Sequence, residues 1–390
     1  MAGGDLDAAA LLDRARNETG LGDWGDDTFE HRFGLAVDHI NSIPMDAAGR
    51  RAAADNINWL LTDRLKFFND FKLYPLADEV IDHPMFATGE PRSGTTLMHA
   101  LMSVDPDGRA LKFWEVMHPS PPPGTVTGVD PRIALADEEW LEINAKLWKW
   151  LYCHPYNDML GDGPPEDERT WAFDFRVMTP TAWWRVPMQN LSMGLPTDAA
   201  VQNRIHKMML QSLQYKREKK YWVLKGFHGF RLKEFFDTYP DATLVWLHRD
   251  PVQVAASSVA MIRDIMLGIV GEIDMIAEAR VHVDRIRMSI ANTMTNPLVM
   301  DRRVHHVRYK DFVADQIGTI RGYYEFTGRE LTPQAEAAMR DYLASNKGDR
   351  HGKFEYSTSL LTDAGFDIDE LNEEFRPFRE RFDVPIENRN

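Results

Sequence analysis

Cysteine is almost absent from this sequence, which has Cys153 as its single thiol in 390 residues. One thiol excludes a disulfide within the chain and a metal site built from paired cysteines, and it is typical of a reducing cytoplasm. Positive charge is also scarce, because 45 lysines and arginines face 60 acidic residues and leave a formal net charge of −15. Since nucleic-acid binders normally carry a basic balance, we expect no nucleic-acid partner. A single anionic ligand needs only a local basic pocket and is compatible with this charge.

Long apolar segments are missing as well. No uninterrupted apolar run approaches the roughly 18–20 residues that span a bilayer. The first twenty residues, MAGGDLDAAALLDRARNETG, are acidic and have no apolar core, so we expect neither a signal peptide nor a membrane anchor. We therefore predict a cytoplasmic protein without a membrane span. The oligomeric state is left open by the sequence, including a homo-oligomer.

Two kinds of pattern divide the chain. Residues 1–80 place apolar side chains at three- and four-residue spacing, which predicts a helical N-terminal extension packed on the main domain, residues 81–390. In the main domain, short β-rich runs are each followed by a helical pattern, which predicts an α/β fold: a P-loop-like parallel sheet flanked by helices. These runs are MFATG (85–89), YWVLKG (221–226), ATLVWLHR (242–249) and RVHHVRY (303–309). Residues 113–220 are rich in proline and tryptophan and predict a helical insertion that walls a substrate pocket.

The stretch TGEPRSGTTLMHAL, residues 88–101, resembles a nucleotide-triphosphate loop whose lysine is missing. Gly89 and Gly94 keep the G-x-x-x-x-G spacing, but Thr95 takes the lysine position and Arg92 is the strong cation. Amides at the start of the following helix would form an anion site. The hydroxyl donors for that site are Ser93, Thr95 and Thr96. No acidic strand end is placed to hold a metal for this loop, so we expect a metal-independent site.

A second motif, VWLHRDPVQVAASS, covers residues 245–258. Arg249 follows an apolar strand, Asp250 is a typical N-cap, and Pro251 takes the first helical position. Ser257 lies two turns into that helix, so it and Arg249 are expected to meet one anionic group. The alternative is a capped helix with a surface arginine.

A third motif, NKGDRHGKFEYS, covers residues 346–357. Its two glycines, three cations and one histidine suit a mobile loop that folds over an anion. The alternative is a solvated surface loop.

Together these motifs resemble those of sulfotransferases that use 3′-phosphoadenosine 5′-phosphosulfate (PAPS), in particular a broad bacterial branch. PRSGTTL resembles the family's 5′-phosphosulfate loop, HRDPVQVAASS its 3′-phosphate motif, and NKGDRHGKFEYS the loop over the cofactor. The resemblance covers roughly residues 85–385. It implies that the loop with Arg92 holds the 5′-phosphosulfate, and that Arg249 and Ser257 hold the 3′-phosphate. The further cofactor contacts that it implies are Tyr309, Arg350, His351, Gly352 and Lys353.

The resemblance also implies a base that takes the proton of the acceptor. His228 in VLKGFHGF is the candidate, with Lys225 before it, because the family carries a lysine-x-histidine element between its two cofactor motifs. Here that element is one residue longer, K-G-F-H. Some branches use a glutamate instead, and the rival carboxylates are Glu115, Glu166 and Glu168.

The sequence therefore predicts transfer of the sulfuryl group from PAPS to a hydroxyl or amine of a small, apolar acceptor. One alternative is a P-loop kinase or nucleotide hydrolase, which Thr95 and the Arg249–Ser257 pair disfavour. Another is a relative that binds the cofactor and has lost catalysis.

Overall fold

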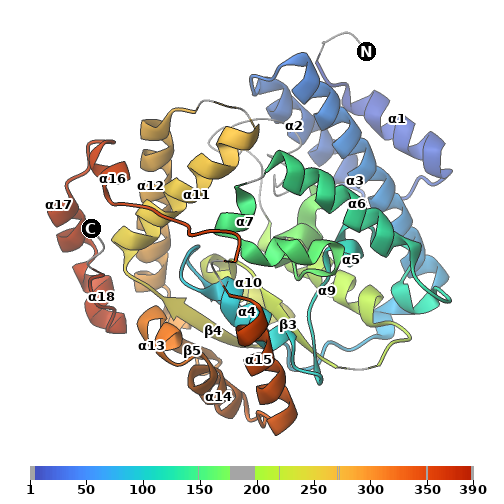
Figure 1. The fold of residues 1–390 in the computed structure, drawn as a ribbon. Coiled ribbons are helices and arrows are strands. Elements are labelled where there is room, and N and C mark those ends of the chain that lie inside the picture. The colour runs from blue at the N-terminus through green and yellow to red at the C-terminus, as the bar shows by residue number, and fades with distance from the viewer. Residues whose placement is uncertain are drawn as a thin grey trace.

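The computed structural model describes residues 5–147, 149–175, 198–218, 220–269, 271, 273–347 and 350–387. The centre of this part of the chain is a parallel sheet with the strand order β2-β3-β1-β4-β5 (Figure 1). The strands are β1 (Met85–Gly89), β2 (Gly108–Arg109), β3 (Tyr221–Lys225), β4 (Thr243–His248) and β5 (Val304–Arg308). Four of them coincide with the β-rich runs of the sequence, whereas β2 is too short for a pattern to predict. The α/β fold with a parallel sheet is confirmed.

Alternate side chains of each strand enter separate cores on the two faces of the sheet. Phe86 is in register with Leu224 and Leu244, and all three are fully buried in one core. Ala87 and Val245, which are also in register, belong to the core on the other face. Because both faces are covered, the strands read as nearly continuous apolar runs, as buried parallel strands do.

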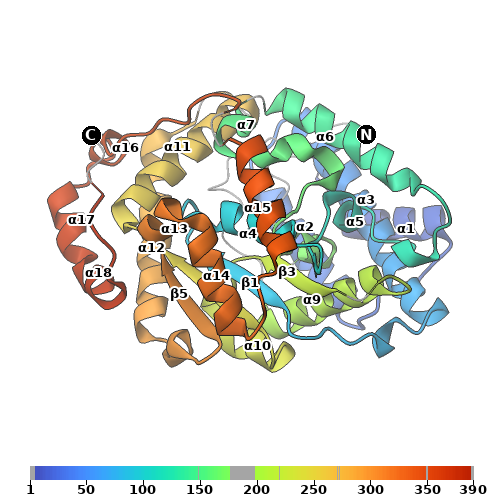
Figure 2. The same ribbon diagram turned by 60° about the horizontal axis from the view of Figure 1, so that its bottom comes forward.

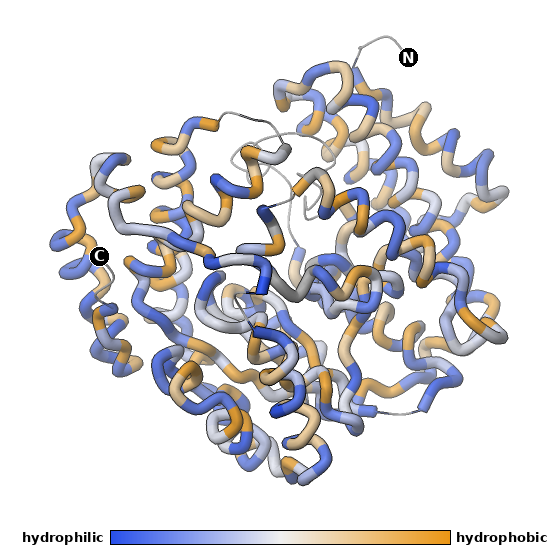
Figure 3. Tube along the Cα trace, in the orientation of Figure 1, coloured by the Kyte–Doolittle hydropathy of each residue, from blue (hydrophilic) through white to orange (hydrophobic). Residues whose placement is uncertain are grey.

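The helices form one layer on each face. The first layer is α9 (Ala199–Gln214), α10 (Leu232–Thr238), α11 (Pro251–Ile269) and α12 (Met275–Thr295). The second layer is α4 (Thr95–Ser103), α13 (Tyr309–Ala314), α14 (Gln316–Thr327) and α15 (Pro333–Ser345). Figure 2 shows α14 and α15 in front of the sheet. Hydrophilic and hydrophobic positions interleave along these helices, as expected when one side packs on the sheet (Figure 3).

The predicted insertion consists of short helices beside the β2 edge of the sheet. They are α5 (Phe113–Met117), η2 (Pro123–Thr125), α6 (Pro131–Lys146), α7 (Trp150–Cys153), η3 (Pro155–Asp162) and η4 (Asp167–Asp174). The start of α6 follows from its sequence, because the Asp130 side chain accepts a hydrogen bond from the Arg132 amide and Pro131 takes the first helical position. Residues 176–197 of the insertion lie outside the described part of the chain.

The N-terminal helices form a core of their own. They are α1 (Ala8–Thr19), α2 (Phe29–Ser42), α3 (Ala47–Leu73) and the 3-10 turn η1 (Leu76–Asp78). Arg64 of α3 joins this core to the insertion, because its Nη1 donates to Asp174 Oδ1 at 2.8 Å and both side chains are fully buried. The helical character predicted for the extension is observed, and its boundary at residue 80 stays a prediction.

The remaining elements are the 3-10 turns η6 (His228–Arg231) and η7 (Pro297–Met300), which precede α10 and β5, and the C-terminal helices α16 (Ser359–Thr362), α17 (Ile368–Glu374) and α18 (Arg376–Phe382). The C-terminal helices lie on the opposite side of the molecule from the N-terminal helices (Figure 1). Within the described ranges, every helix is too short or too polar to cross a membrane.

Candidate active site

The carboxyl ends of the parallel strands bring distant segments together at one edge of the sheet. Gly89 at the end of β1 is in register with Leu247 of β4, and Ala87 is in register with Lys225 of β3. Open α/β sheets bind their ligands beyond these ends. The segments that follow β1, β3 and β4 therefore form the candidate site.

The loop between β1 and α4 turns at three residues with positive φ angles. These are Gly89 at 148°, Arg92 at 69° and Gly94 at 94°. A Cβ at Gly89 would lie 2.6 Å from the carbonyl oxygen of Leu247, so the close approach of the two strands requires glycine. The turn ends at α4, whose first amides form a favourable place for an anion.

Arg92 points from this loop toward the second predicted motif. Its Nε donates to Ser257 Oγ at 3.1 Å, and its Nη1 donates to the carbonyl oxygen of Cys153 at 3.1 Å. The guanidinium carbon also lies 4.8 Å from the centre of the Phe354 ring. Burial lowers the pKa of Arg92, but an arginine remains charged. A buried cation thus connects the loop, α11 and the loop after α15.

Arg249 lies beside it, at the end of β4. Its Nη1 donates to the carbonyl oxygen of Arg92 at 2.7 Å, and its guanidinium carbon lies 4.3 Å from the centre of the Tyr309 ring. Arg92, Arg249 and Ser257 therefore converge at one place, and the cofactor contacts assigned to them stay predictions.

The guanidinium of Arg249 also holds a carboxylate from the C-terminal segment. Glu387 accepts from its Nε at 2.8 Å and from its Nη2 at 2.9 Å, and Tyr356 Oη accepts from Nη2 at 2.6 Å. Burial acts to lower the pKa of Arg249, but the hydrogen bond to Glu387 and the electrostatic effects of Tyr356, Tyr309 and Glu387 together outweigh it, and the net shift is upward. Neither Glu387 nor Tyr356 was singled out in the sequence, because no local pattern connects them to β4.

The loop after α15 contacts Arg92 and Arg249 through Phe354 and Tyr356, which the motif did not single out. Arg350 and His351 both contact Asp158 of the insertion, at 2.8 Å and 2.7 Å. The Lys353 side chain is 80% exposed and pairs with Glu355. Gly352, at a φ of 117°, packs against the Tyr152 ring. Their cofactor contacts stay predictions, while Phe354 and Tyr356 reach the two arginines.

The hydroxyls of the loop differ in their surroundings. Ser93 is buried, and its Oγ donates to the carbonyl oxygen of Glu90 at 2.6 Å. Thr95 is buried at the first position of α4. Thr96 Oγ1 accepts a hydrogen bond from Lys225 Nζ at 3.0 Å, and that lysine is also ion-paired with Glu166. Lys225 therefore connects the start of α4 to a carboxylate of the insertion.

His228 lies in a buried polar cluster close in the chain to Lys225. Its Nε2 lies 2.8 Å from Asp167 Oδ2, while His206 Nε2 lies 3.9 Å from Asp167 Oδ1. His206 Nδ1 in turn lies 2.6 Å from the Tyr239 hydroxyl. Burial lowers the pKa of His228, which the nearby Asp167 partly offsets. Burial acts to raise the pKa of Asp167, but its two histidine partners reverse the shift and hold that pKa well below its usual range.

The other two candidate carboxylates differ from Glu166. Glu115 is buried, its Oε1 accepts from Arg109 at 2.7 Å and from Arg217 at 3.3 Å, and its Oε2 accepts from the Lys112 amide at 3.2 Å. These contacts include the capping box of α5, and the catalytic role predicted for Glu115 stays a prediction. The side chain of Glu168 lies outside the described residues.

A family model described as the sulfotransferase family matches residues 84–333, more than half of the chain. The chain belongs to the sulfotransferase family. This confirms the resemblance carried by the sequence motifs.

Known sulfotransferases share this fold over nearly the whole chain. The crystal structure of sulfotransferase STF9 from Mycobacterium avium has a TM-score of 0.83 and 27% identity, and the match covers 99% of this chain and 100% of that one. For STF1 from Mycobacterium tuberculosis H37Rv the TM-score is 0.73 at 22% identity, with 95% and 98% covered. Omega-hydroxy-beta-dihydromenaquinone-9 sulfotransferase Stf3 of Mycobacterium bovis is 24% identical over 298 residues, 70% of this chain and 69% of that protein. The predicted P-loop-like fold and the enzyme class are confirmed.

Proposed function

We propose that this sulfotransferase moves the sulfuryl group of PAPS to a hydroxyl, or an amine, of a small acceptor. The observation that carries the proposal is the convergence of Arg92, Arg249 and Ser257 beyond the carboxyl ends of β1 and β4. Two guanidinium groups and a hydroxyl in one buried place suit a ligand with two separate anionic groups. PAPS has such a pair, on its 3′ and 5′ sides.

The residues at this place fit that cofactor. The Arg249 guanidinium already holds the two oxygens of the Glu387 carboxylate, and a phosphate offers the same pair of acceptors. We assign the 3′-phosphate to Arg249 and Ser257, and the 5′-phosphosulfate to Arg92 and to the start of α4. When bound, PAPS supplies the sulfuryl group, and its phosphate leaves with the electrons of the broken sulfur–oxygen bond.

Glu166 is the base that the geometry favours. Its side chain is 38% exposed, and its ion pair with Lys225 places it one side chain away from Thr96 at the start of α4. A carboxylate there can accept the proton of an acceptor hydroxyl. Lys225 would orient that carboxylate and stabilise negative charge at the same end of the loop.

His228, the base that the sequence predicts, stays the alternative. With Asp167 ionised, His228 Nε2–H donates a hydrogen bond to Asp167 Oδ2, which leaves Nδ1 as the proton acceptor. The His228 residue is only 5% exposed, which makes direct contact with an acceptor harder than for Glu166. We expect Glu166→Gln to lower turnover by roughly 10²–10⁴-fold with little change in cofactor affinity. The same result for His228→Asn, with Glu166→Gln active, would reverse the assignment.

Calorimetry with adenosine 3′,5′-bisphosphate tests the cofactor site. We expect binding without magnesium, and we expect Ser257→Ala to weaken it by about tenfold, which is roughly 1.4 kcal/mol. Ser258→Ala is the matched control, because Ser258 is the next residue of α11 and is equally buried. Equal effects of the two variants on nucleotide affinity would contradict the role assigned to Ser257. Binding of magnesium-ATP in place of adenosine 3′,5′-bisphosphate would contradict the proposal and favour a kinase or hydrolase.

The acceptor and the location stay proposals as well. The insertion at 113–220 is proposed to form the acceptor pocket, and the name of Stf3 specifies a hydroxylated acceptor for that relative. A cytoplasmic location and the lack of a nucleic-acid partner follow from composition alone. Sulfation of a hydroxyl compound with labelled PAPS, measured by mass spectrometry, would separate an active enzyme from a relative that only binds the cofactor.

A further inference from the structure

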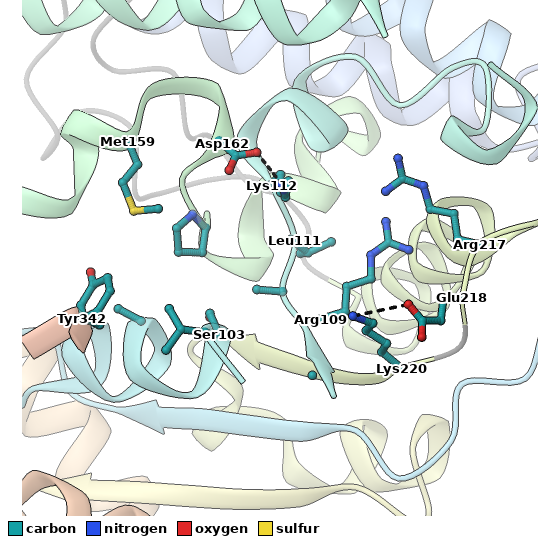
Figure 4. A pocket seen from close by; sticks show the side chains of 15 residues that line it. Ser103, Arg109, Leu111, Lys112, Met159, Asp162, Arg217, Glu218, Lys220 and Tyr342 are labelled. Atoms are coloured by element: carbon teal, nitrogen blue, oxygen red, sulfur yellow. Dashed lines mark hydrogen bonds and ion pairs between the residues drawn. The ribbon is translucent and has the colours of Figure 1, made fainter. Parts of the chain in front are cut away.

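A cavity of about 510 Å³ lies at the β2 edge of the sheet (Figure 4). Residues 108–112, which include β2, form its floor, and Ser103 and Tyr342 lie on one side. Arg217 and Lys220 lie on the other side. Its volume falls in the range of roughly 300–1,000 Å³ that small-molecule sites occupy.

Two segments lead from this cavity to the proposed reacting end. On α4, Thr96 contacts Lys225, and Ala100, one turn later on the same helix face, lines the cavity. One turn advances about 6 Å along a helix. On the insertion, Pro164 lines the cavity and stands two residues before Glu166. Two residues of the lining are therefore close in the chain to the group formed by Lys225, Glu166 and Thr96, Ala100 by one helical turn and Pro164 by two residues.

The lining contains both apolar and charged side chains. Its apolar part comes from α4, the segment after β2 and η3, with the side chains of Ala100, Val104, Leu111 and Met159. Its charged part carries four cations and two carboxylates: Arg109, Lys112, Arg217, Lys220, Asp162 and Glu218. The cavity is thus amphipathic.

Among the described residues, the cations of the lining outnumber their carboxylate partners. Arg109 and Arg217 share a single oxygen of the buried Glu115, at 2.7 Å and 3.3 Å. Lys112 pairs with Asp162, and Lys220 Nζ lies 3.6 Å from Glu218. Within the described ranges, four cations and three carboxylates leave one positive charge in excess at the Arg109–Arg217 pair, in a chain whose formal net charge is −15. The Arg217 side chain, 36% exposed, is the member of the shared pair that a ligand can reach.

We propose that this cavity holds the acceptor, and that the acceptor is an amphiphile with an acidic group at Arg217 and its hydroxyl at Glu166. The inference rests on the proposed function, because the reacting end is defined by the cofactor loop. The length of β3 gives the distance between the two ends of the acceptor. Lys220 lines the cavity and Lys225 marks the reacting end, and the five-residue step between them spans roughly 16 Å on an extended strand. The acidic group and the hydroxyl are therefore separated by an extended apolar chain or ring system.

Calorimetry with 12-hydroxydodecanoic acid and its methyl ester, in the presence of adenosine 3′,5′-bisphosphate, tests this. Extended, the acid is comparable in length to that distance, and the ester removes the charge and adds one methyl group. We expect the acid to bind about tenfold more tightly than the ester, since it meets an unbalanced guanidinium. Arg217→Gln should abolish that preference, and Lys112→Gln, at a more exposed side chain, should reduce it.

Lys233→Gln is the control, because Lys233 is an exposed lysine of α10 that pairs with Asp237 away from the cavity. Equal binding of acid and ester, failure of both to bind, or an unchanged preference in a folded Arg217→Gln variant would overturn the inference. Titration with adenosine 3′,5′-bisphosphate alone distinguishes a failure of the proposed function from a failure of the proposed acceptor class. Failure of the nucleotide to bind contradicts the proposed function, whereas nucleotide binding without acid binding contradicts only the acceptor class.

Discussion

Glu387 is hydrogen-bonded to Arg249 through both of its carboxylate oxygens, although 138 residues separate them in the sequence. The Glu387 amide also donates to Asp250 Oδ2 at 2.9 Å, so the C-terminal segment is held at the end of β4 by two contacts. A carboxylate on the arginine that we assign to the 3′-phosphate has to leave before that phosphate can bind. The C-terminal segment is therefore placed to compete with the cofactor.

We expect Glu387→Gln to bind adenosine 3′,5′-bisphosphate several-fold more tightly than the wild type. The amide removes the negative charge that competes for Arg249, and a gain of tenfold would correspond to about 1.4 kcal/mol. Titration calorimetry measures the change. Glu380→Gln is the control, because Glu380 is an exposed acid of α18. Unchanged or weaker affinity in Glu387→Gln would mean that the carboxylate helps to build the site.

Gly94→Ala should weaken the binding of adenosine 3′,5′-bisphosphate by tenfold or more and lower the free energy of unfolding by about 1–3 kcal/mol. Gly94 has a φ of 94°, and a Cβ there would lie 3.1 Å from the Tyr309 ring. Gly20→Ala is the matched control, since Gly20 also has a positive φ but has nothing within 4 Å of the added carbon. Urea unfolding and calorimetry of both variants separate backbone strain from damage to the loop. Equal nucleotide affinity in the two variants would contradict this prediction.

Arg64→Ala should cost up to about 3–5 kcal/mol of unfolding free energy, because the fully buried Asp174 loses its ion pair at 2.8 Å and keeps the longer one with Arg32 at 3.3 Å. Arg14→Ala, which breaks an exposed pair with Glu18, should cost less than about 1 kcal/mol. The double variant Arg64→Ala/Asp174→Ala should recover part of the loss, since no unpaired charge remains. A double variant less stable than Arg64→Ala would argue that packing, and not the ion pair, is responsible. Chemical denaturation at pH 7 is the measurement.

Asp63→Asn should stabilise the protein more at pH 8 than at pH 4.5. Burial raises the pKa of Asp63 from 3.8 to about 7, against the opposing effect of His118. The unfolded chain therefore loses this proton first, and stability falls as the pH rises from about 4 to about 7. Asparagine removes that penalty, which is on the order of a few kcal/mol when fully developed. A stability difference between variant and wild type that is the same at both pH values would contradict the shift.

The sequence predicted what local patterns and short motifs determine. The strands, the helical extension and the loop with Arg92 follow from apolar periodicity and from glycine spacing. Arg92 and Arg249 were expected at the same edge of the sheet, because they follow the carboxyl ends of neighbouring parallel strands, whereas the direct hydrogen bond from Arg92 to Ser257 was not predicted.

The rest depends on contacts between segments without a shared pattern. Glu387 and Tyr356 reach Arg249 from the C-terminal region, and Arg350 and His351 pair with Asp158 of the insertion. These pairings are set by how the insertion and the C-terminal helices pack, which periodicity does not report.

Glu166 and Asp167 are adjacent in the chain but have partners on different sides: Glu166 contacts Lys225, and Asp167 contacts His228 and His206. The segment before them is tied to the start of α5, because the Phe113 amide donates to the carbonyl oxygen of Gly163 at 3.0 Å. Deleting or inserting one residue between Gly163 and Glu166 would shift the two carboxylates along the chain, so that each partner would face the wrong one. Enzyme engineers who reshape the acceptor side of this protein should therefore vary side chains in that stretch and keep its length constant.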